Sequence, residues 1–202
     1  MSVKSSNQRT SQKKLTRERI LAAAIEVFER EGILAATSLE IARAAGVSHG
    51  SVFVHFGTKE GLLVAAIRSF GETLSLRLHE LCDAGALLRA ALAAHLDAIR
   101  EREAFYTRLV VEAPLLPPDV RECLVLIQST IAFHVAPAVQ AAKDRGEIRE
   151  LSLPLLFNTW LGLVHHYLAN RELFAPGTSL VEARGRELLD HFMSMIETGG
   201  SR

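Results

Sequence analysis

A cluster of small, polar and aromatic residues lies between positions 37 and 63, where the chain runs TSLEIARAAGVSHGSVFVHFGTKEGLL. Two short helical stretches meet there through a tight turn at Gly46, and Ser48 can cap the second stretch. The free N–H groups at a helix start can face a phosphate, and the missing side chain of Gly50 lets the backbone approach base edges. The segment therefore predicts a helix-turn-helix whose second helix enters the major groove of DNA.

Nine residues of this segment are candidates for DNA contact. They are Thr37, Ser38, Ser48, His49, Gly50, Ser51, Phe53, His55 and Lys59. Base contacts are expected near His49 and Gly50, while the polar side chains around them would bind phosphates, which fix the register. Phe53 can contact a thymine methyl group or pack in the core. His55 can bind phosphate or hydrogen-bond the helix end, and Lys59 can bind phosphate or be a solvated residue.

Helical periodicity places these residues on short helices followed by a long one. Apolar residues from position 20 to 28 fall on one face of a first helix that stops at Gly32. Thr37 and Glu40 fit a capping box at the start of a second helix. Ser48 begins a third helix over about 48–55, and Thr58 caps a fourth over about 59–81.

The rest of the chain also predicts helices, so the fold class is all-α. The expected spans are 85–101, 103–112, 118–145, 152–170 and 179–197. About half of the 202 residues are apolar, which is enough for a sizeable core. Three regions follow: a disordered basic arm over 1–15, a helix-turn-helix DNA-binding domain over 16–63, and a helical effector-binding and dimerisation domain over 64–202. The arm could seek phosphates or be a solvated tail.

A more specific pattern runs in order through residues 16–63. It consists of Ile20-Leu21-Ala22-Ala23-Ala24, Phe28 and Gly32, Ile41-Ala42, Ala45-Gly46-Val47-Ser48, Gly50-Ser51, Phe56, Lys59-Glu60 and Leu62-Leu63. In these positions the chain resembles the TetR (tetracycline-repressor-like) family of transcriptional regulators. The resemblance implies a homodimer that binds a palindromic double-stranded DNA operator and is released by a small-molecule effector. The family usually has tyrosine at the position of Phe53, so one phosphate contact is in question here. The resemblance favours phosphate contacts for His55 and Lys59.

Polar and aromatic residues set in apolar helices after position 64 are candidates to bind that effector. They are His95, Phe105, Tyr106, Gln128, Phe133, His134, Asn158, Trp160 and His165. Core packing or an interface role is the alternative for each of them. Pro137 predicts a kink that frees the carbonyl of Phe133. The scarcity of charges among these helices suggests a hydrophobic or aromatic effector.

Two apolar patterns near the end of the chain predict a dimer interface. The residues are Leu156, Trp160, Val164, Val181, Leu188, Leu189, Phe192, Met193 and Ile196. An intramolecular core is the alternative. Residues 151–170 carry no charge and are long enough to cross a bilayer. Polar residues such as Asn158 and His165 are poor lipid-facing groups, so a buried interface helix is the better interpretation.

Other functional classes lack a signature in this sequence. Cys82 and Cys123 have no metal-like spacing and indicate a reducing compartment, and the polar N-terminus predicts a cytoplasmic protein without a secretion signal. His165 and His166 are adjacent on a helix and point apart, which argues against a shared metal. No nucleophile elbow, phosphate-binding loop or zinc-protease motif is present, so we expect neither an enzyme nor a cofactor. An activator of the same fold, an orphan small-molecule sensor and a helical enzyme are the alternatives.

Overall fold

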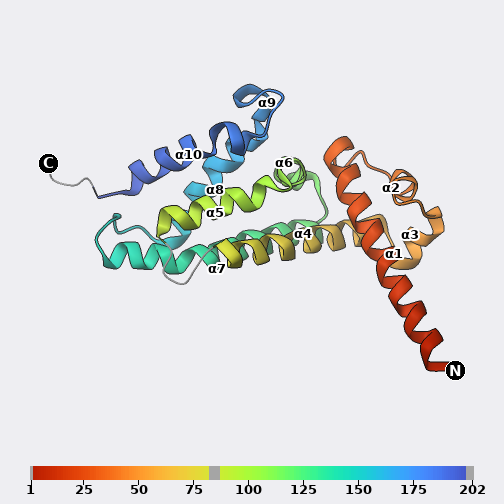
Figure 1. Cartoon of the computed structure of the whole chain (residues 1–202). Coiled ribbons are helices and arrows are strands. Elements are labelled where there is room, and N and C mark those ends of the chain that lie inside the picture. Colours follow the sequence, from red (N-terminus) through yellow and green to blue (C-terminus); the bar gives the residue numbers. More distant parts are fainter. Residues whose placement is uncertain (1, 82–86, 199–202) are drawn as a thin grey trace. The chain divides into compact units, whose positions relative to one another are not determined.

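The computed structural model describes residues 2–81 and 87–198, and within these ranges the secondary structure is almost entirely helical (Figure 1). The elements are α1 (Ser2–Glu31), α2 (Ser38–Ala44), α3 (His49–Phe56), α4 (Lys59–Leu81), α5 (Leu88–Arg100), α6 (Glu103–Glu112), the short 3₁₀ helix η1 (Ala113–Leu115), α7 (Pro118–Asp144), α8 (Leu153–Ala169), α9 (Arg171–Phe174) and α10 (Leu180–Ile196). Extended pairing in the described part is limited to one isolated bridge between Ile148 and Glu197. The all-α prediction is therefore confirmed.

The long predicted helices agree with the observed ones to within a few residues. The span 103–112 matches α6, and 59–81 matches α4. Helix α5 begins at Leu88, whereas the prediction began at 85; residues 85 and 86 lie outside the described ranges. The sequence predicts neither η1 nor the one-turn α9, because elements this short carry too few residues to show a period.

The predicted disordered arm is a difference between expectation and structure. Helix α1 begins at Ser2, so residues 2–15 continue the first helix of the module. Neither glycine nor proline interrupts the chain before Gly32, and Lys14 forms an i,i+4 ion pair with Glu18 at 3.8 Å. A polar composition suggested disorder, but the segment also contains good helix formers (Lys, Arg, Gln and Leu) and continues a helix already in place.

The chain divides into two compact units. The first comprises the residues up to Phe70 together with Glu112–Leu124, and the second comprises Gly71–Val111 and the residues from Val125 onward. Helices α4 and α7 each contribute residues to both units, and the predicted domain boundary after residue 63 falls inside α4. Fully buried side chains of the first unit include Ile20, Phe28, Ile41 and Leu62.

In the second unit, α10 packs on α5 and α8. The carboxylate of Glu103 anchors the start of α10, because it accepts hydrogen bonds from Leu180 N at 2.8 Å, Val181 N at 3.0 Å and Ser179 Oγ at 2.6 Å. An acidic group at a helix N-terminus satisfies free N–H groups and complements the helix dipole. This contact fixes the first turn of α10 to the first turn of α6.

The residues predicted to form a dimer interface lie mainly inside the single chain. Eight of them are buried there: Leu156, Trp160, Val164, Leu188, Leu189, Phe192, Met193 and Ile196, and Val181 is half-buried. The apolar periodicity of α8 and α10 therefore reports their packing within one protomer. A periodic stripe shows which face of a helix is covered but not by which chain.

One described helix, α7, is long and apolar enough to span a membrane by length and composition. Only a third of its most apolar window is buried inside the structure, and core helices of globular proteins can meet the same criterion. This is weak evidence for a membrane span, and α7 is not the stretch that the sequence analysis examined for one.

Candidate nucleic-acid interface and small-molecule site

A capping box fixes the start of α2. Thr37 Oγ1 accepts a hydrogen bond from Glu40 N at 3.2 Å, and the Glu40 carboxylate accepts one from Thr37 N at 2.9 Å. Hydrogen bonds from the Thr37 side chain and backbone lower the pKa of Glu40, so this carboxylate remains ionised. The predicted capping box is confirmed, and it presents the exposed Thr37 and the half-exposed Ser38 at one helix end.

Helix α3 is held by a cap at each end. Ser48 Oγ accepts from Ser51 N at 3.2 Å and lies 2.8 Å from Ser51 Oγ, and Gly57 ends the helix with a positive φ of 75°. Val52 is buried and packs in the core. Gly50 is exposed, and a Cβ built on it would meet no atom within 4 Å. No internal contact among the described residues therefore requires a glycine at position 50.

A continuous polar and aromatic row crosses from α2 to the outer face of α3. Ser38 Oγ and His49 Nε2 are hydrogen-bonded at 2.8 Å, and the His49 ring meets the Phe53 ring edge-on at a centroid distance of 5.0 Å. Packing in the core was the alternative raised for Phe53. The side chain is 41% exposed, so it is not fully buried there. Val54 is also exposed, but it was not among the predicted DNA contacts. An apolar residue next to a buried position gave no sign in the sequence that it faces outward.

Of the two residues expected to reach phosphate, Lys59 is engaged within the chain and His55 is not hydrogen-bonded through Nδ1 within the described part of it. Lys59 Nζ donates to Leu34 O at 3.2 Å, and Lys59 is half-buried. His55 Nδ1 is buried and has no hydrogen-bond partner among the described residues. The guanidinium of Arg17 lies 5.0 Å from the centroid of Phe56, which places one cationic group beside α3 that the sequence analysis did not single out.

The loop between α1 and α2 is held by a residue distant in sequence. The carboxylate of Glu112 accepts hydrogen bonds from Ile33 N at 3.2 Å and Leu34 N at 2.7 Å. Lys59 donates to the carbonyl of Leu34, so both polar groups of that peptide residue are bound by charged side chains. We call the bonds from Ile33 and Leu34 to Glu112 the Glu112 clamp. Sequence spacing gave no signal for it, because its partners are 78 and 79 positions apart.

Four of the nine predicted effector residues meet in the core of the second unit. Trp160 Nε1 donates to His95 Nδ1 at 2.9 Å, and the Tyr106 hydroxyl and His165 Nε2 are hydrogen-bonded at 2.8 Å. Burial lowers the pKa of His95 to about 3, with a smaller contribution from His165. Burial also lowers the pKa of His165 to about 4 and raises that of Tyr106. We call His95, Tyr106, Trp160 and His165 the core cluster.

The other predicted effector residues do not join one site. Phe105 is fully buried, whereas Asn158 is exposed and Phe133 is 76% exposed. His134 lies 3.3 Å from Ser75 Oγ through Nε2, and burial followed by the nearby His79 lowers its pKa. Gln128 is half-buried on α7. Periodicity could not separate inward from outward positions on a helix as apolar as α7.

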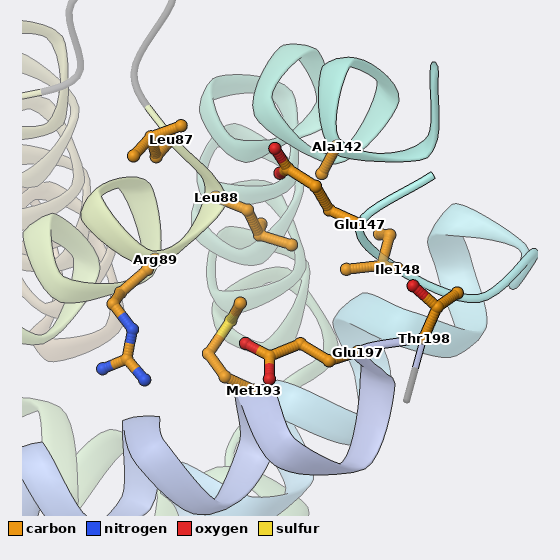
Figure 2. A pocket seen from close by; sticks show the side chains of 9 residues that line it. All are labelled: Leu87, Leu88, Arg89, Ala142, Glu147, Ile148, Met193, Glu197 and Thr198. Carbon is orange, nitrogen blue, oxygen red and sulfur yellow. The ribbon is translucent and has the colours of Figure 1, made fainter. Parts of the chain in front are cut away.

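An open pocket lies elsewhere in the second unit (Figure 2). It has a volume of about 450 Å³ and is lined by Leu87, Leu88, Arg89, Ala142, Glu147, Ile148, Met193, Glu197 and Thr198. Figure 2 shows Leu88, Ile148 and Met193 gathered between the ends of α5, α7 and α10. None of the predicted effector residues lines it. Among the described residues, no three His, Cys, Asp or Glu side chains are grouped to hold a metal ion.

Comparisons with known proteins match both the module and the fold. Residues 20–66 match the model of the family described as bacterial regulatory proteins, tetR family. The chain is 46% identical over 63 residues to the transcriptional regulator TtgW of Pseudomonas putida, which covers 31% of this chain and 47% of TtgW. It is 35% identical over 135 residues to the transcriptional regulator BetI of Rhizobium meliloti, covering 67% of this chain and 56% of BetI.

A solved structure of similar fold is the transcriptional regulator FadR of Bacillus subtilis in complex with stearoyl-CoA. The TM-score is 0.74 at 20% identity, and the likeness covers 88% of this chain and 97% of that one. At this identity the likeness establishes the fold only. The chain covers about half the length of these two sequence relatives.

Proposed function

This chain belongs to the TetR family of bacterial regulatory proteins, and from that premise we propose that it is a ligand-responsive transcriptional repressor that binds a palindromic operator as a homodimer. The observation that carries the proposal is the exposed row from Ser38 through His49 to Phe53. It lies on the outer face of a capped helix that follows a tight turn, which is the geometry that enters a major groove.

Base recognition falls to the first turn of α3. His49 is exposed and its ring is oriented by Ser38 and Phe53, so it can present a nitrogen to a base edge without a large loss of side-chain freedom. Gly50 leaves room for the backbone beside it. The partly exposed Phe53 can contact a thymine methyl group, which needs no hydroxyl.

Phosphate contacts would surround this row. Thr37, Ser48, Ser51, His55 and Lys59 lie at helix ends or on the flanks of α2 and α3. In the proposal Lys59 exchanges the Leu34 carbonyl for a phosphate oxygen, and the N–H groups at the start of α3 add a partial positive charge. Two such modules in a dimer would meet successive major grooves about 34–36 Å apart.

The homodimer would form through the exposed side of α8. The side chains there carry no charge and recur at helical spacing: Leu155, Asn158, Thr159, Gly162 and His166. Gly162 has no atom within 4 Å of a built Cβ, which leaves space for close approach of a second helix. The buried residues first expected at this interface would support the face from behind.

Release from DNA would follow effector binding in the second unit, at the core cluster. Helix α4 runs from the first unit into the second without a break, so a shift of α4 would alter the placement of α3. The effector must bind the DNA-incompetent state more tightly, because equal binding to both states shifts nothing. The proposal places the protein in the cytoplasm, and it requires no cofactor and no catalytic step.

Selection of the purified protein against random duplex DNA tests this function. We expect a palindromic site, and an affinity that falls steeply as salt rises because phosphate contacts release counterions. A folded dimer that enriches no sequence would overturn the proposal. An asymmetric site bound by a monomer would overturn the homodimer.

A further inference from the structure

The core of the second unit holds a hydrogen-bond donor without an acceptor. His95 is 0% exposed, and its Nδ1 accepts the indole N–H of Trp160 at 2.9 Å. An indole nitrogen can only donate, so Nδ1 of His95 must be unprotonated. A neutral imidazole then carries its proton on Nε2. In the described part of the chain, Nε2 of His95 is buried and has no hydrogen-bond partner.

The charge state of His95 follows from its surroundings. Burial, with a smaller contribution from the neighbouring His165, lowers its pKa to about 3, so the ring is neutral at pH 7. A buried N–H without an acceptor is rare in folded proteins, because the group loses its hydrogen bond to water and gains none. Such a group calls for an acceptor from outside the chain, either a water molecule or a ligand atom.

The residues around Nε2 define what that acceptor can be. Tyr106 and His165 satisfy one another, and both are neutral at pH 7, since burial raises the pKa of Tyr106 and lowers that of His165 to about 4. The one charged residue among the buried side chains of the described residues is Glu103, whose carboxylate already accepts three hydrogen bonds at the start of α10. No buried cation is therefore available for an anionic ligand, and no free buried carboxylate for a cationic one.

We propose that this core binds an uncharged, largely apolar molecule whose carbonyl, hydroxyl or ether oxygen accepts the Nε2–H of His95. The inference rests on the proposed function in one respect, namely that this molecule is the effector. His95 and Trp160 have no exposed surface, so the molecule can enter only when the packing of α10 against α5 and α8 loosens. Binding and a change in shape of the second unit are therefore coupled.

The test uses four probes of one shape and the full-length protein. Benzylacetone offers a ketone oxygen, butylbenzene has no acceptor, hydrocinnamate replaces the ketone by a carboxylate, and the amine derived from benzylacetone carries a cation. Trp160 is the single tryptophan of the chain and donates to His95, so its fluorescence reports binding at the site. We expect benzylacetone to bind at least about tenfold more tightly than each of the other three, the value of one hydrogen bond to a buried donor.

Two variants at one position separate hydrogen bonding from packing. His95→Leu removes the donor, and the preference for benzylacetone over butylbenzene should fall to about onefold. His95→Gln keeps an N–H donor on a side chain of similar reach, and it should retain part of the preference. Nitrogen NMR of the histidine rings provides a check that needs no variant, with Nε2 of His95 protonated and Nδ1 unprotonated at pH 7.

Several outcomes would overturn the inference. These are equal binding of benzylacetone and butylbenzene, stronger binding of either charged probe, a proton on Nδ1 of His95, or no fluorescence change with any probe up to its solubility limit. Equal binding would indicate that a water molecule satisfies Nε2. If a probe binds but the DNA complex stays intact, His95 lies in a binding site that is not the effector site. The repressor function is tested separately, by the DNA selection described above.

Discussion

Replacing Glu112 tests how the α1–α2 loop is held. In Glu112→Ala both bonds of the Glu112 clamp are lost. Leu34 is exposed, so its N–H can turn to water, but Ile33 is 1% exposed and its N–H would be left without an acceptor. A hydrogen bond to a charged group contributes about 1.5–3 kcal/mol, and an unsatisfied buried donor costs about 1–3 kcal/mol. These two figures describe the same Ile33 bond, so they are not added. We expect Glu112→Ala to destabilise the folded loop by about 2–3 kcal/mol.

Glu112→Gln should cost less than the alanine substitution. The amide keeps one carbonyl oxygen, which can accept from one of the two N–H groups, while the charge is lost. About 1 kcal/mol is expected, the value of a neutral hydrogen bond. Graded loss in the order wild type, glutamine, alanine would indicate that the carboxylate acts through these bonds and not through side-chain packing.

Amide hydrogen exchange at Ile33 and Leu34 is the direct assay. A loss of about 2–3 kcal/mol corresponds to exchange roughly 30- to 150-fold faster in Glu112→Ala, because each 1.4 kcal/mol is a factor of ten. Glu122→Gln is a matched control, since Glu122 is an exposed glutamate of the same unit. Unchanged exchange at both amides in Glu112→Ala would refute the assignment of the clamp, and so would an equal effect of the control.

Three further predictions concern DNA contact and the core cluster. His49→Ala should weaken binding to the selected operator by roughly 1–3 kcal/mol and relax its sequence preference in competition assays, and a variant that keeps its preference would remove His49 from base contact. Lys59→Ala should lower the slope of log affinity against log salt by about one, and an unchanged slope would refute its phosphate contact. Burial lowers the pKa values of His95 and His165 to about 3 and about 4, from an ordinary value of 6.5, so the unfolded chain binds more protons than the folded one between these limits. Stability in urea should therefore be full above pH 6.5 and fall as pH drops towards 4, less so in His95→Gln; an identical pH profile for that variant would contradict the burial argument.

The helices of the module could be predicted because their boundaries are set locally. Thr37 accepts from Glu40 N and Ser48 from Ser51 N, in each case three residues along, so the cap is visible in the sequence itself. The same holds for Thr58, which accepts from Gly61 N at 3.0 Å. Local hydrogen bonds of this kind do not depend on which other part of the chain packs nearby.

Contacts that depend on tertiary packing could not be predicted. Glu112 and Glu103 are ordinary glutamates in a pattern of helical residues, and only the fold brings them to backbone N–H groups far along the chain. Trp160 was expected at both an effector site and an interface, and it is a fully buried core residue bonded to His95. Periodicity identified these positions as covered, but it contains no information about the covering element.

The unfilled position at Gly50 gives the module room for new specificities. Glycine inside a helix is less favourable than alanine by about 1 kcal/mol, and a Cβ at position 50 would touch nothing within 4 Å. Substitution there should therefore leave the scaffold intact, or strengthen α3, while placing a new group on the outward face beside His49. A library of side chains at this one site would diversify the sequences that the protein recognises without a compensating change in its core.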